Sequence, residues 1–259
     1  MLGRLVTIGK NSLKRRNFIV MANKVASRIN ERKFRKPAAA LAWCREQSED
    51  CDAFLKSLDA ELYEETQQAA REIEHHCQAK LAGINFNLGG GGNYPLLYFL
   101  TRYMNPTNVV ETGVAAGWSS QAILAALNRN GKLGRLYSSD FPYFRYDNPE
   151  ELIGVVVDDK LRANWNLNVA GDRYSLPKIV EEVEEIDLFH YDSDKSYVGR
   201  AFALNAIESS LSEKAVVIFD DIQDNTHFQN YVTENEHAYK VFEFQGKYVG
   251  LIGSSLINS

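Results

Sequence analysis

The sequence contains no apolar run that approaches the roughly 18 residues needed for a membrane-spanning helix. It also lacks, near its N-terminus, the compact apolar stretch and small-residue cleavage site of a secretory signal peptide. Only three cysteines occur, Cys44, Cys51 and Cys77, and none forms a CxxC pair. Their small, odd number argues against a disulfide framework or a thiolate zinc site. Cys44 and Cys51 are seven residues apart, so we expect them to share a helix face, as buried thiols in a cytoplasmic protein.

Acidic residues are nearly missing from residues 1–36. This segment has eleven Lys or Arg and one acid, Glu31, so it carries a net +10 in a chain whose total charge is −5. Such a basic arm could lie on an anionic membrane surface, contact nucleic acid or act as an organelle transit peptide. It could equally be a solvated extension that packs on a neighbouring subunit. The acidic remainder of the chain argues against a broad nucleic-acid interface.

Helical patterning dominates residues 37–88. No glycine or proline occurs between Ala38 and Gly83, and apolar residues recur at helical spacing. We expect one or two helices that cover a face of the domain formed by residues 89–259. The four glycines at 89–92 follow no strand pattern, so we interpret them as a joint or lid over a ligand site rather than as a phosphate loop.

Strand and helix patterns alternate through residues 89–259. Apolar strand patterns occur at NVVETG, GRLYSSD, WNLNVAGD, IDLFHYD and KAVVIFDD, with helical patterns between them, including one near 149–163. This alternation is typical of a parallel sheet with helices on both faces. The tail, AYKVFEFQGKYVGLIG, has two strand patterns around a tight turn, which predicts an antiparallel hairpin.

The segment VVETGVAAGWSS, Val109 to Ser120, is a strand that runs into a glycine turn and a helix. Such turns hold nucleotides and related ligands. The third glycine of the dinucleotide fingerprint and the lysine of the P-loop are both missing here. Glu111 stands at the strand end, beside the turn made by Gly113 and Gly117. An acid at this place suits a ligand with an amine or sulfonium rather than a phosphate.

Acids also end the next two strands. Asp140 follows Gly117 by 23 residues, which is where a ribose diol is held in folds of this kind. Asp172 ends the third strand and could accept from an adenine amino group. Taken singly, each acid could also be a turn residue or a helix cap.

Three further acids follow the last two parallel strands. Asp192 lies in HYDSDKSY, and Asp220 and Asp221 end the neighbouring strand pattern. Because adjacent strands are only about 4.8 Å apart, these carboxylates can converge. Carboxylates that share one place repel unless a cation neutralises them, and a hard oxygen site suits Mg²⁺ or Ca²⁺.

Together, VVETGVAAGWSS, GRLYSSD, AGD, IDLFHYDSDKSY and VVIFDDI resemble the class I S-adenosylmethionine-dependent methyltransferases. More narrowly, they resemble O-methyltransferases related to the catechol, caffeoyl-CoA and macrolide-sugar enzymes. The resemblance covers about Gly89 to Gly253. It implies a Rossmann-like α/β fold with a seven-stranded, mostly parallel sheet whose last strand is antiparallel, preceded here by an N-terminal helical extension.

The resemblance also implies roles for particular residues. S-adenosylmethionine would be bound by Glu111, Gly113, Ala115, Gly117, Ser119, Ser120, Asp140, Asp172 and Asp192. In the metal-dependent members, acids at the positions of Asp192, Asp220 and Asp221 hold the metal, here expected to be Mg²⁺. The lysine at the position of Lys195, three residues after Asp192, is the general base.

Two of these roles stay open on the sequence alone. Many relatives carry histidine in place of Lys195 and some bind no metal, and Lys195 could instead form an ion pair with Asp194 or Asp220. His190 faces the same side of its strand as Asp192, so it could act at the catalytic site or simply be packed. Asn225, His227 and Phe228 could line an acceptor site.

The leading hypothesis is therefore an S-adenosylmethionine-dependent O-methyltransferase that acts on a small molecule or a sugar hydroxyl, with help from a divalent cation. The alternative is a protein of the same fold that lost catalysis and docks a membrane or partner through residues 1–36. An NAD-dependent oxidoreductase is disfavoured by the glycine spacing and the terminal hairpin. N-terminal helical additions often mediate pairing, so a homodimer is a further expectation.

Overall fold

The computed structural model describes residues 37–85, 88–131, 134–141 and 150–257. The basic arm of residues 1–36 lies outside these ranges. So do Tyr143 and Tyr146, two aromatic residues that could stack on adenine or an acceptor. Among the described residues, no helix combines the length and the apolar character needed to cross a membrane.

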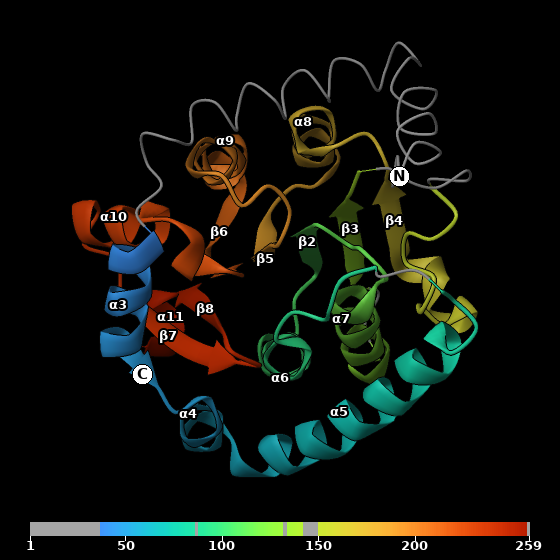
Figure 1. Ribbon diagram of the computed structural model, residues 1–259. Helices are drawn as coiled ribbons and strands as arrows, with labels where there is room; N and C mark the ends of the chain where they lie inside the picture. The colour runs from blue at the N-terminus through green and yellow to red at the C-terminus, as the bar shows by residue number, and fades with distance from the viewer. Residues whose placement is uncertain (1–36, 86–87, 132–133, 142–149, 258–259) are drawn as a thin grey trace.

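An eight-stranded sheet forms the centre of the molecule (Figure 1). Its strand order is β1-β7-β8-β6-β5-β2-β3-β4, and neighbouring strands are parallel except where β8 pairs with β6 and β7. The strands are β1 (Ser48–Glu49), β2 (Asn108–Thr112), β3 (Arg135–Ser139), β4 (Trp165–Asn168), β5 (Ile186–Tyr191), β6 (Leu211–Phe219), β7 (Tyr239–Phe244) and β8 (Lys247–Ile252). The predicted seven strands with an antiparallel last strand are confirmed, and β1 is an addition.

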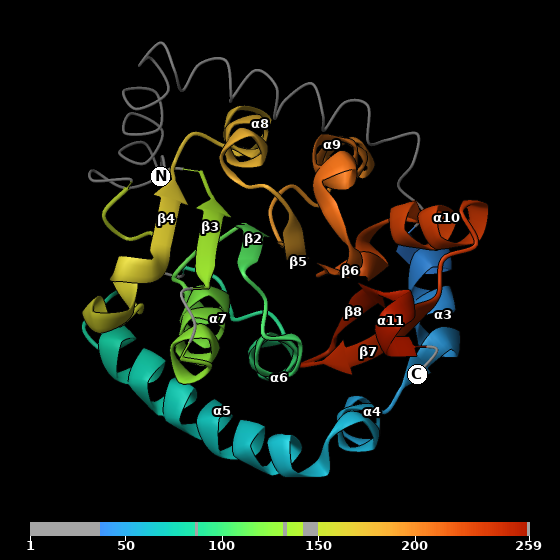
Figure 2. The ribbon, with the colours of Figure 1, turned by 180° about the vertical axis from the view of Figure 1, so that it is seen from behind.

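Helices cover both faces of this sheet (Figures 1 and 2). Helices α8 and α9 lie on one face, and α6 and α7 lie on the other, with α5 packed outside them. The α-helices are α3 (Pro37–Gln47), α4 (Cys51–Leu58), α5 (Ala60–Leu81), α6 (Tyr94–Met104), α7 (Trp118–Arg129), α8 (Asp172–Glu182), α9 (Tyr197–Ile207), α10 (His227–Glu234) and α11 (Ser254–Ile257). Short 3₁₀ turns are η1 (Asp159–Asn164), η2 (Glu208–Ser210) and η3 (Ile222–Asp224).

The N-terminal region contains three helices and strand β1, rather than the one or two helices expected. Asp59 accounts for one of the breaks. Its carboxylate accepts from the N–H of Leu62 and begins α5, while its own N–H donates to the carbonyl of Leu55 and ends α4. Asp50 caps α4 in the same way, through the N–H of Ala53. Two aspartate caps thus divide what looks like one continuous helical pattern.

The cysteine prediction is partly wrong. Cys44 lies in α3 and Cys51 lies in α4, with β1 between them, so the two do not share a helix face. Cys44 and Cys77 are buried, Cys51 is partly buried, and all three are free thiols. Burial raises the pKa of each thiol to about 12, so these cysteines behave as apolar packing residues.

The α-helix expected near 149–163 is also wrong for the residues described there. Residues 150–158 form turns, and only the 3₁₀ turn η1 follows. Gly154 explains the difference, because it adopts a left-handed φ of 66° and its Cα faces the ring of Trp165, with which an added Cβ would overlap. A residue in this conformation interrupts a right-handed helix.

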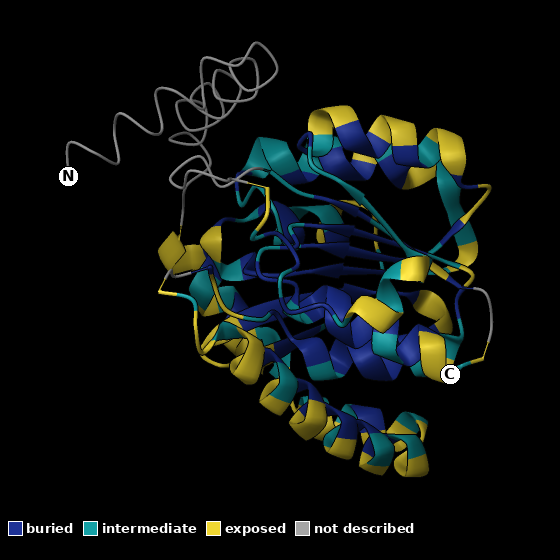
Figure 3. Cartoon of the chain, turned by 90° about the vertical axis from the view of Figure 1, so that its right-hand side faces the viewer, coloured by how far each residue is buried: buried dark blue, intermediate teal, exposed yellow. Residues whose placement is uncertain are grey.

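Alternating side chains divide the core into two layers. Val110 and Phe189 point toward α8 and α9, whereas Val109 and Leu188 point toward α6 and α7. Figure 3 shows the strands as buried and the exposed residues on the outer sides of the helices. Because both faces are covered, the polar residues that matter for function gather where the strands end.

Candidate active site at the carboxyl ends of the strands

Glu111 lies in β2, an interior strand of the sheet between β5 and β3, and is fully buried. In the sheet register it pairs with Ser138 of β3 on one side and with His190 of β5 on the other. Its Oε2 accepts from the hydroxyl of Ser120, at 2.5 Å, and from the hydroxyl of Ser138, at 2.9 Å. Parallel pairing therefore brings Ser138 and His190, which are far from Glu111 in the sequence, to its carboxylate.

The other carboxylate oxygen of Glu111, Oε1, differs in its hydrogen bonding. Oε1 is buried and has no hydrogen-bond partner among the described residues, and the same is true of Nδ1 of His190, which lies 3.5 Å away. His190 is itself 1% exposed. A buried carboxylate oxygen without a donor is costly, so this position favours a ligand that brings a donor or a positive charge.

The glycines of the turn are required by the protein's own packing. Gly113 has φ of 82°, and an added Cβ would overlap the carbonyl of Asp192. Gly117 has φ of 103°, and an added Cβ would lie 2.8 Å from Cα of Gly154. Any side chain at these two positions would push the turn away from the loops that enclose it. Direct contact of Gly113 and Gly117 with a cofactor stays a prediction.

Asp140, at the end of β3, binds this turn. Its Oδ2 accepts from the backbone N–H groups of Val114, at 3.1 Å, and Ala115, at 2.7 Å, and its Oδ1 accepts from the N–H of Phe141. Burial raises the pKa of Asp140 from 3.8 to about 6, and the charges of Asp172 and Glu111 act in the same direction. The carboxyl therefore changes its charge at about pH 6.

Asp172 opens α8 and joins the ends of two strands. Its carboxylate accepts from the hydroxyls of Ser139, at 2.8 Å, and of Ser193. Ser119 and Ser120, in the first turn of α7, are both buried. The predicted cofactor residues thus surround the carboxyl ends of β2, β3 and β5, and their contact with a cofactor stays a prediction.

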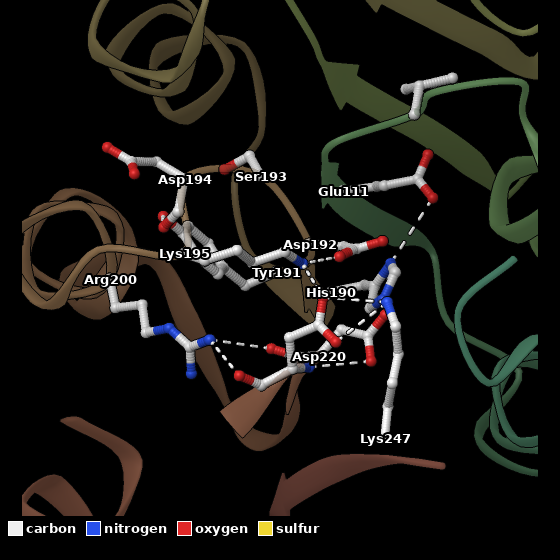
Figure 4. A network of polar contacts seen from close by, with 12 residues as sticks. Glu111, His190, Tyr191, Asp192, Ser193, Asp194, Lys195, Arg200, Asp220 and Lys247 are labelled. Atoms are coloured by element: carbon white, nitrogen blue, oxygen red, sulfur yellow. Dashed lines mark hydrogen bonds and ion pairs between the residues drawn. The ribbon is translucent and has the colours of Figure 1, made fainter. Parts of the chain in front are cut away.

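The second group of acids meets as the sequence predicted (Figure 4). Tyr191 and Phe219 are paired at the ends of β5 and β6, so the residues that follow them, Asp192 and Asp220, leave the sheet side by side. Ligand atoms of Asp192, Asp220 and Asp221 all lie within 4.8 Å of one another. Asp221 adopts a left-handed φ of 52°, which turns its carboxylate back toward the other two.

Gly92 lies against this acid cluster. An added Cβ at Gly92 would be 3.0 Å from Oδ2 of Asp220 and 3.8 Å from Nε2 of His190. The glycine run at 89–92 therefore lies beside the catalytic candidates, as its interpretation as a cover over a ligand site requires. Its movement as a lid stays a prediction.

Two lysines contact the acid cluster. Nζ of Lys195 contacts Oδ1 of Asp192 and lies 3.2 Å from Oδ2 of Asp221, so its ion pairs differ from the predicted alternatives, Asp194 and Asp220. Nζ of Lys247, in β8, lies 3.0 Å from Oδ1 of Asp221. Burial lowers the pKa of Lys195, although Asp221 and Asp220 oppose the shift. A lysine whose ammonium form is destabilised is suited to accept a proton.

Arg200, in α9, is a site residue that the sequence did not reveal. It is fully buried, and its Nη2 donates to the carbonyl oxygens of Asp220, at 3.1 Å, and Asp221, at 2.7 Å. Nε and Nη1 have no hydrogen-bond partner among the described residues. Arg200 thus fixes the backbone of Asp220 and Asp221 through their carbonyl oxygens. An isolated arginine inside a helical pattern carries no signal of this role.

The residues after the acid pair have structural contacts. The side chain of Asn225 donates to the carbonyl of Lys195, at 2.7 Å. Phe228 is 1% exposed and packs against Phe219 and Gly250, and its lining of an acceptor site stays a prediction. His227 is 4% exposed, and burial lowers its pKa to about 3, so it is neutral.

Comparisons with known proteins identify the kind of domain that carries these residues. Residues 110–222 match a family model described as a methyltransferase domain, and this span includes every residue predicted to bind the cofactor or the metal or to act in catalysis. This match confirms the predicted resemblance to methyltransferases, whereas the narrower resemblance to the catechol, caffeoyl-CoA and macrolide-sugar enzymes stays a prediction. No curated protein sequence matches the chain.

Solved structures with similar folds include three methyltransferases. An O-methyltransferase from Bacillus cereus in complex with SAH has 16% identity and a TM-score of 0.55, over 70% of this chain and 90% of that chain. The O-methyltransferase TomG from Streptomyces achromogenes, involved in tomaymycin synthesis and in complex with SAM, has 16% identity and a TM-score of 0.56, over 70% and 88%. A methyltransferase from Geobacter sulfurreducens has 20% identity and a TM-score of 0.53, over 70% and 87%. At these identities the likeness establishes the methyltransferase fold.

Proposed function

We propose that this chain, which contains a methyltransferase domain, transfers a methyl group from S-adenosylmethionine to a hydroxyl of a small molecule or a sugar. The observation that carries the proposal is the buried Oε1 of Glu111, which has no hydrogen-bond donor among the described residues. It lies on the strand that begins the matched domain. S-adenosylmethionine carries both an amine and a sulfonium, and a buried carboxylate is stabilised by such a charge.

The other residues around the turn support the same ligand. Asp140 is held beside the turn by the N–H groups of Val114 and Ala115, which is the place for a ribose diol. Asp172 lies further along the same edge, after β4, on the side proposed for adenine. Two of the solved structures with this fold were determined with SAH or SAM, which supports S-adenosylmethionine as the methyl donor.

The acid cluster fits a divalent cation. Asp192, Asp220 and Asp221 offer carboxylate oxygens within 4.8 Å of one another, and hard oxygen donors of this kind suit Mg²⁺. We assign the three aspartates as its ligands. A bound cation would lower the pKa of an acceptor hydroxyl and fix its orientation.

Lys195 is the proposed general base. Its Nζ lies between Asp192 and Asp221, at the cluster where an acceptor hydroxyl would be held, and burial lowers its pKa. Proton removal is needed because a free hydroxyl is a weak nucleophile at neutral pH, whereas the sulfonium already activates the methyl group. We also include Asp192, which contacts Lys195, and His190, which lies beside Glu111, in the proposed catalytic group.

Calorimetric titration of the full chain with S-adenosylmethionine, with and without Mg²⁺, tests the donor. Absence of binding under both conditions would reject the proposal. Transfer of a labelled methyl group to a panel of phenols and sugars tests the acceptor class. Binding without transfer to any member would instead favour the catalytically silent protein, and transfer unaffected by EDTA would remove the cation from the proposal.

A further inference from the structure

Lys247 is the first residue of β8 and follows the tight turn formed by Gln245 and Gly246, which have φ values of 50° and 78°. Its Nζ lies 3.0 Å from Oδ1 and 3.2 Å from Oδ2 of Asp221. Nζ of Lys195 lies 3.2 Å from Oδ2 of the same carboxylate. The hairpin therefore brings a second ammonium group to an acid cluster assembled by β5 and β6.

The backbone of Lys247 is anchored to the acid pair. The N–H of Tyr248 donates to Oε1 of Gln223, at 2.9 Å, and Nε2 of the same glutamine donates to Oδ1 of Asp221, at 3.3 Å. The start of β8 is thus joined to the loop that carries Asp221. Lys247 stays beside the acid cluster even when its side chain changes direction.

The side chain itself has a path to solvent. That of Lys247 is 53% exposed, whereas that of Lys195 is 27% exposed and that of Asp221 is 11% exposed. A long, half-exposed lysine can leave a buried carboxylate without disturbing the fold, because its ammonium is readily hydrated.

The ammonium groups stabilise the charges of the cluster. Burial disfavours ionisation of Asp221, but the charges of Lys195 and Lys247 outweigh it, so its pKa is lowered. Both oxygens of Asp221 are within ion-pair distance of Nζ of Lys247, and Asp221 would offer one of them to a divalent cation. A cation bound to one of these oxygens would lie close to the ammonium group, and the two positive charges would repel each other.

We propose that Lys247 is a built-in counter-ion that competes with a divalent cation for Asp221, so that binding of the cation displaces the ammonium group to solvent. The inference rests on the proposed function only in taking the three aspartates as cation ligands. In the cation-free protein, Lys247 keeps the carboxylates from repelling one another. It therefore lowers the affinity for the cation while it preserves the geometry of the cluster.

The test measures Mn²⁺ alone binding to the full chain, by the electron paramagnetic resonance signal of the free ion. Lys247→Gln removes the competing charge and is expected to bind Mn²⁺ about tenfold more tightly than the wild type, which corresponds to about 1.4 kcal/mol. Lys247→Arg keeps the charge and is expected to stay within about twofold of the wild type. Asp192→Asn is expected to weaken binding, which assigns the signal to this cluster.

Lys240→Gln is the matched control, because Lys240 also lies in the terminal hairpin and pairs with an acid, Glu49, away from the cluster. It should leave Mn²⁺ affinity unchanged. Equal Mn²⁺ affinity of the wild type and Lys247→Gln, or no binding to either, would overturn the inference. Titration with S-adenosylmethionine separates the two proposals: a wild type that fails to bind it refutes the proposed function, whereas intact binding with unchanged Mn²⁺ affinity refutes the role of Lys247 alone.

Discussion

Oε1 of Glu111 and Nδ1 of His190 face each other at 3.5 Å, from neighbouring strands. Both atoms are buried, and neither has a hydrogen-bond partner among the described residues. The other oxygen of Glu111 is held by Ser120 and Ser138, so the carboxylate is fixed in orientation while one oxygen is left available. This arrangement is suited to a cationic ligand.

Glu111→Gln should therefore weaken S-adenosylmethionine binding by about 10- to 100-fold, because the amide keeps the shape but loses the charge. Calorimetric titration measures the loss. Glu65→Gln is the control, since Glu65 is a partly buried acid paired with Arg102 on the far helices. The control should bind S-adenosylmethionine normally, and full affinity in Glu111→Gln would contradict the assignment.

We expect the ionisation of Asp140 to make both S-adenosylmethionine binding and protein stability depend on pH. Burial raises its pKa to about 6, and a ribose diol needs an ionised acceptor, so S-adenosylmethionine affinity should fall as the pH drops below about 6. Stability should change in the opposite direction. The folded state holds this proton at a higher pH than the unfolded state, so the contribution of Asp140 to stability decreases as the pH rises from about 4 to about 6. Titrations and urea unfolding across this range, compared with Asp140→Asn, test both. If S-adenosylmethionine affinity does not vary with pH, Asp140 does not bind the ribose diol.

Gly113→Ala should destabilise the fold strongly. The added Cβ would overlap the carbonyl of Asp192, and we expect a loss of about 3 kcal/mol or more in the free energy of unfolding. Gly131→Ala is the matched control, since Gly131 also has a positive φ, of 67°, but nothing within 4 Å of the added Cβ. It should cost only about 1–2 kcal/mol. Equal losses in urea unfolding would show that backbone conformation alone, and not the contact with Asp192, requires the glycine.

Lys195→Met should lower kcat by roughly 100- to 10,000-fold and leave S-adenosylmethionine binding intact, as expected for loss of a general base. Lys195→Arg separates charge from proton transfer, because it keeps the positive charge beside Asp192 and Asp221 but cannot be deprotonated. Both variants should be equally inactive in methyl-transfer assays. Activity restored by arginine would show that Lys195 acts through its charge.

Arg200→Met should destabilise the protein by about 2–4 kcal/mol, because the carbonyls of Asp220 and Asp221 lose a buried donor. It should also weaken Mn²⁺ binding, since the arginine holds the backbone that carries the acid pair. S-adenosylmethionine affinity should persist at temperatures where the variant is folded, because Glu111 lies elsewhere on the sheet edge. Arg200→Lys should restore part of the stability. Unchanged Mn²⁺ affinity in a folded Arg200→Met would limit the arginine to stability.

Much of the site could be predicted because it follows from strand ends. Glu111, Asp140 and Asp192 each follow or end an apolar strand pattern, and the carboxyl ends of parallel strands meet at one edge. The convergence of Asp192 with Asp220 and Asp221 follows from the same rule. These predictions needed only local patterning and the parallel direction of the strands.

Other features could not be predicted from local patterns. Strand β1 has only two residues, Ser48 and Glu49, and forms because it pairs with Val241 and Phe242 of β7 nearly two hundred residues away. The roles of Lys247 and Arg200 likewise depend on elements that approach the acid pair from β8 and α9. Their contacts with the acid pair can be recognised only in the tertiary structure.

The sequence by itself determined the sheet, its antiparallel last strand and the set of acids at its edge, because each depends on periodicity and on residues at strand ends. The tertiary structure alone decided which groups those acids contact. It holds Asp140 against the N–H groups of the turn, leaves one oxygen of Glu111 without a donor among the described residues, and brings two lysines to Asp221. The physical reason is that hydrogen bonds and charge interactions act over a few ångströms in space, and the sequence does not record those separations.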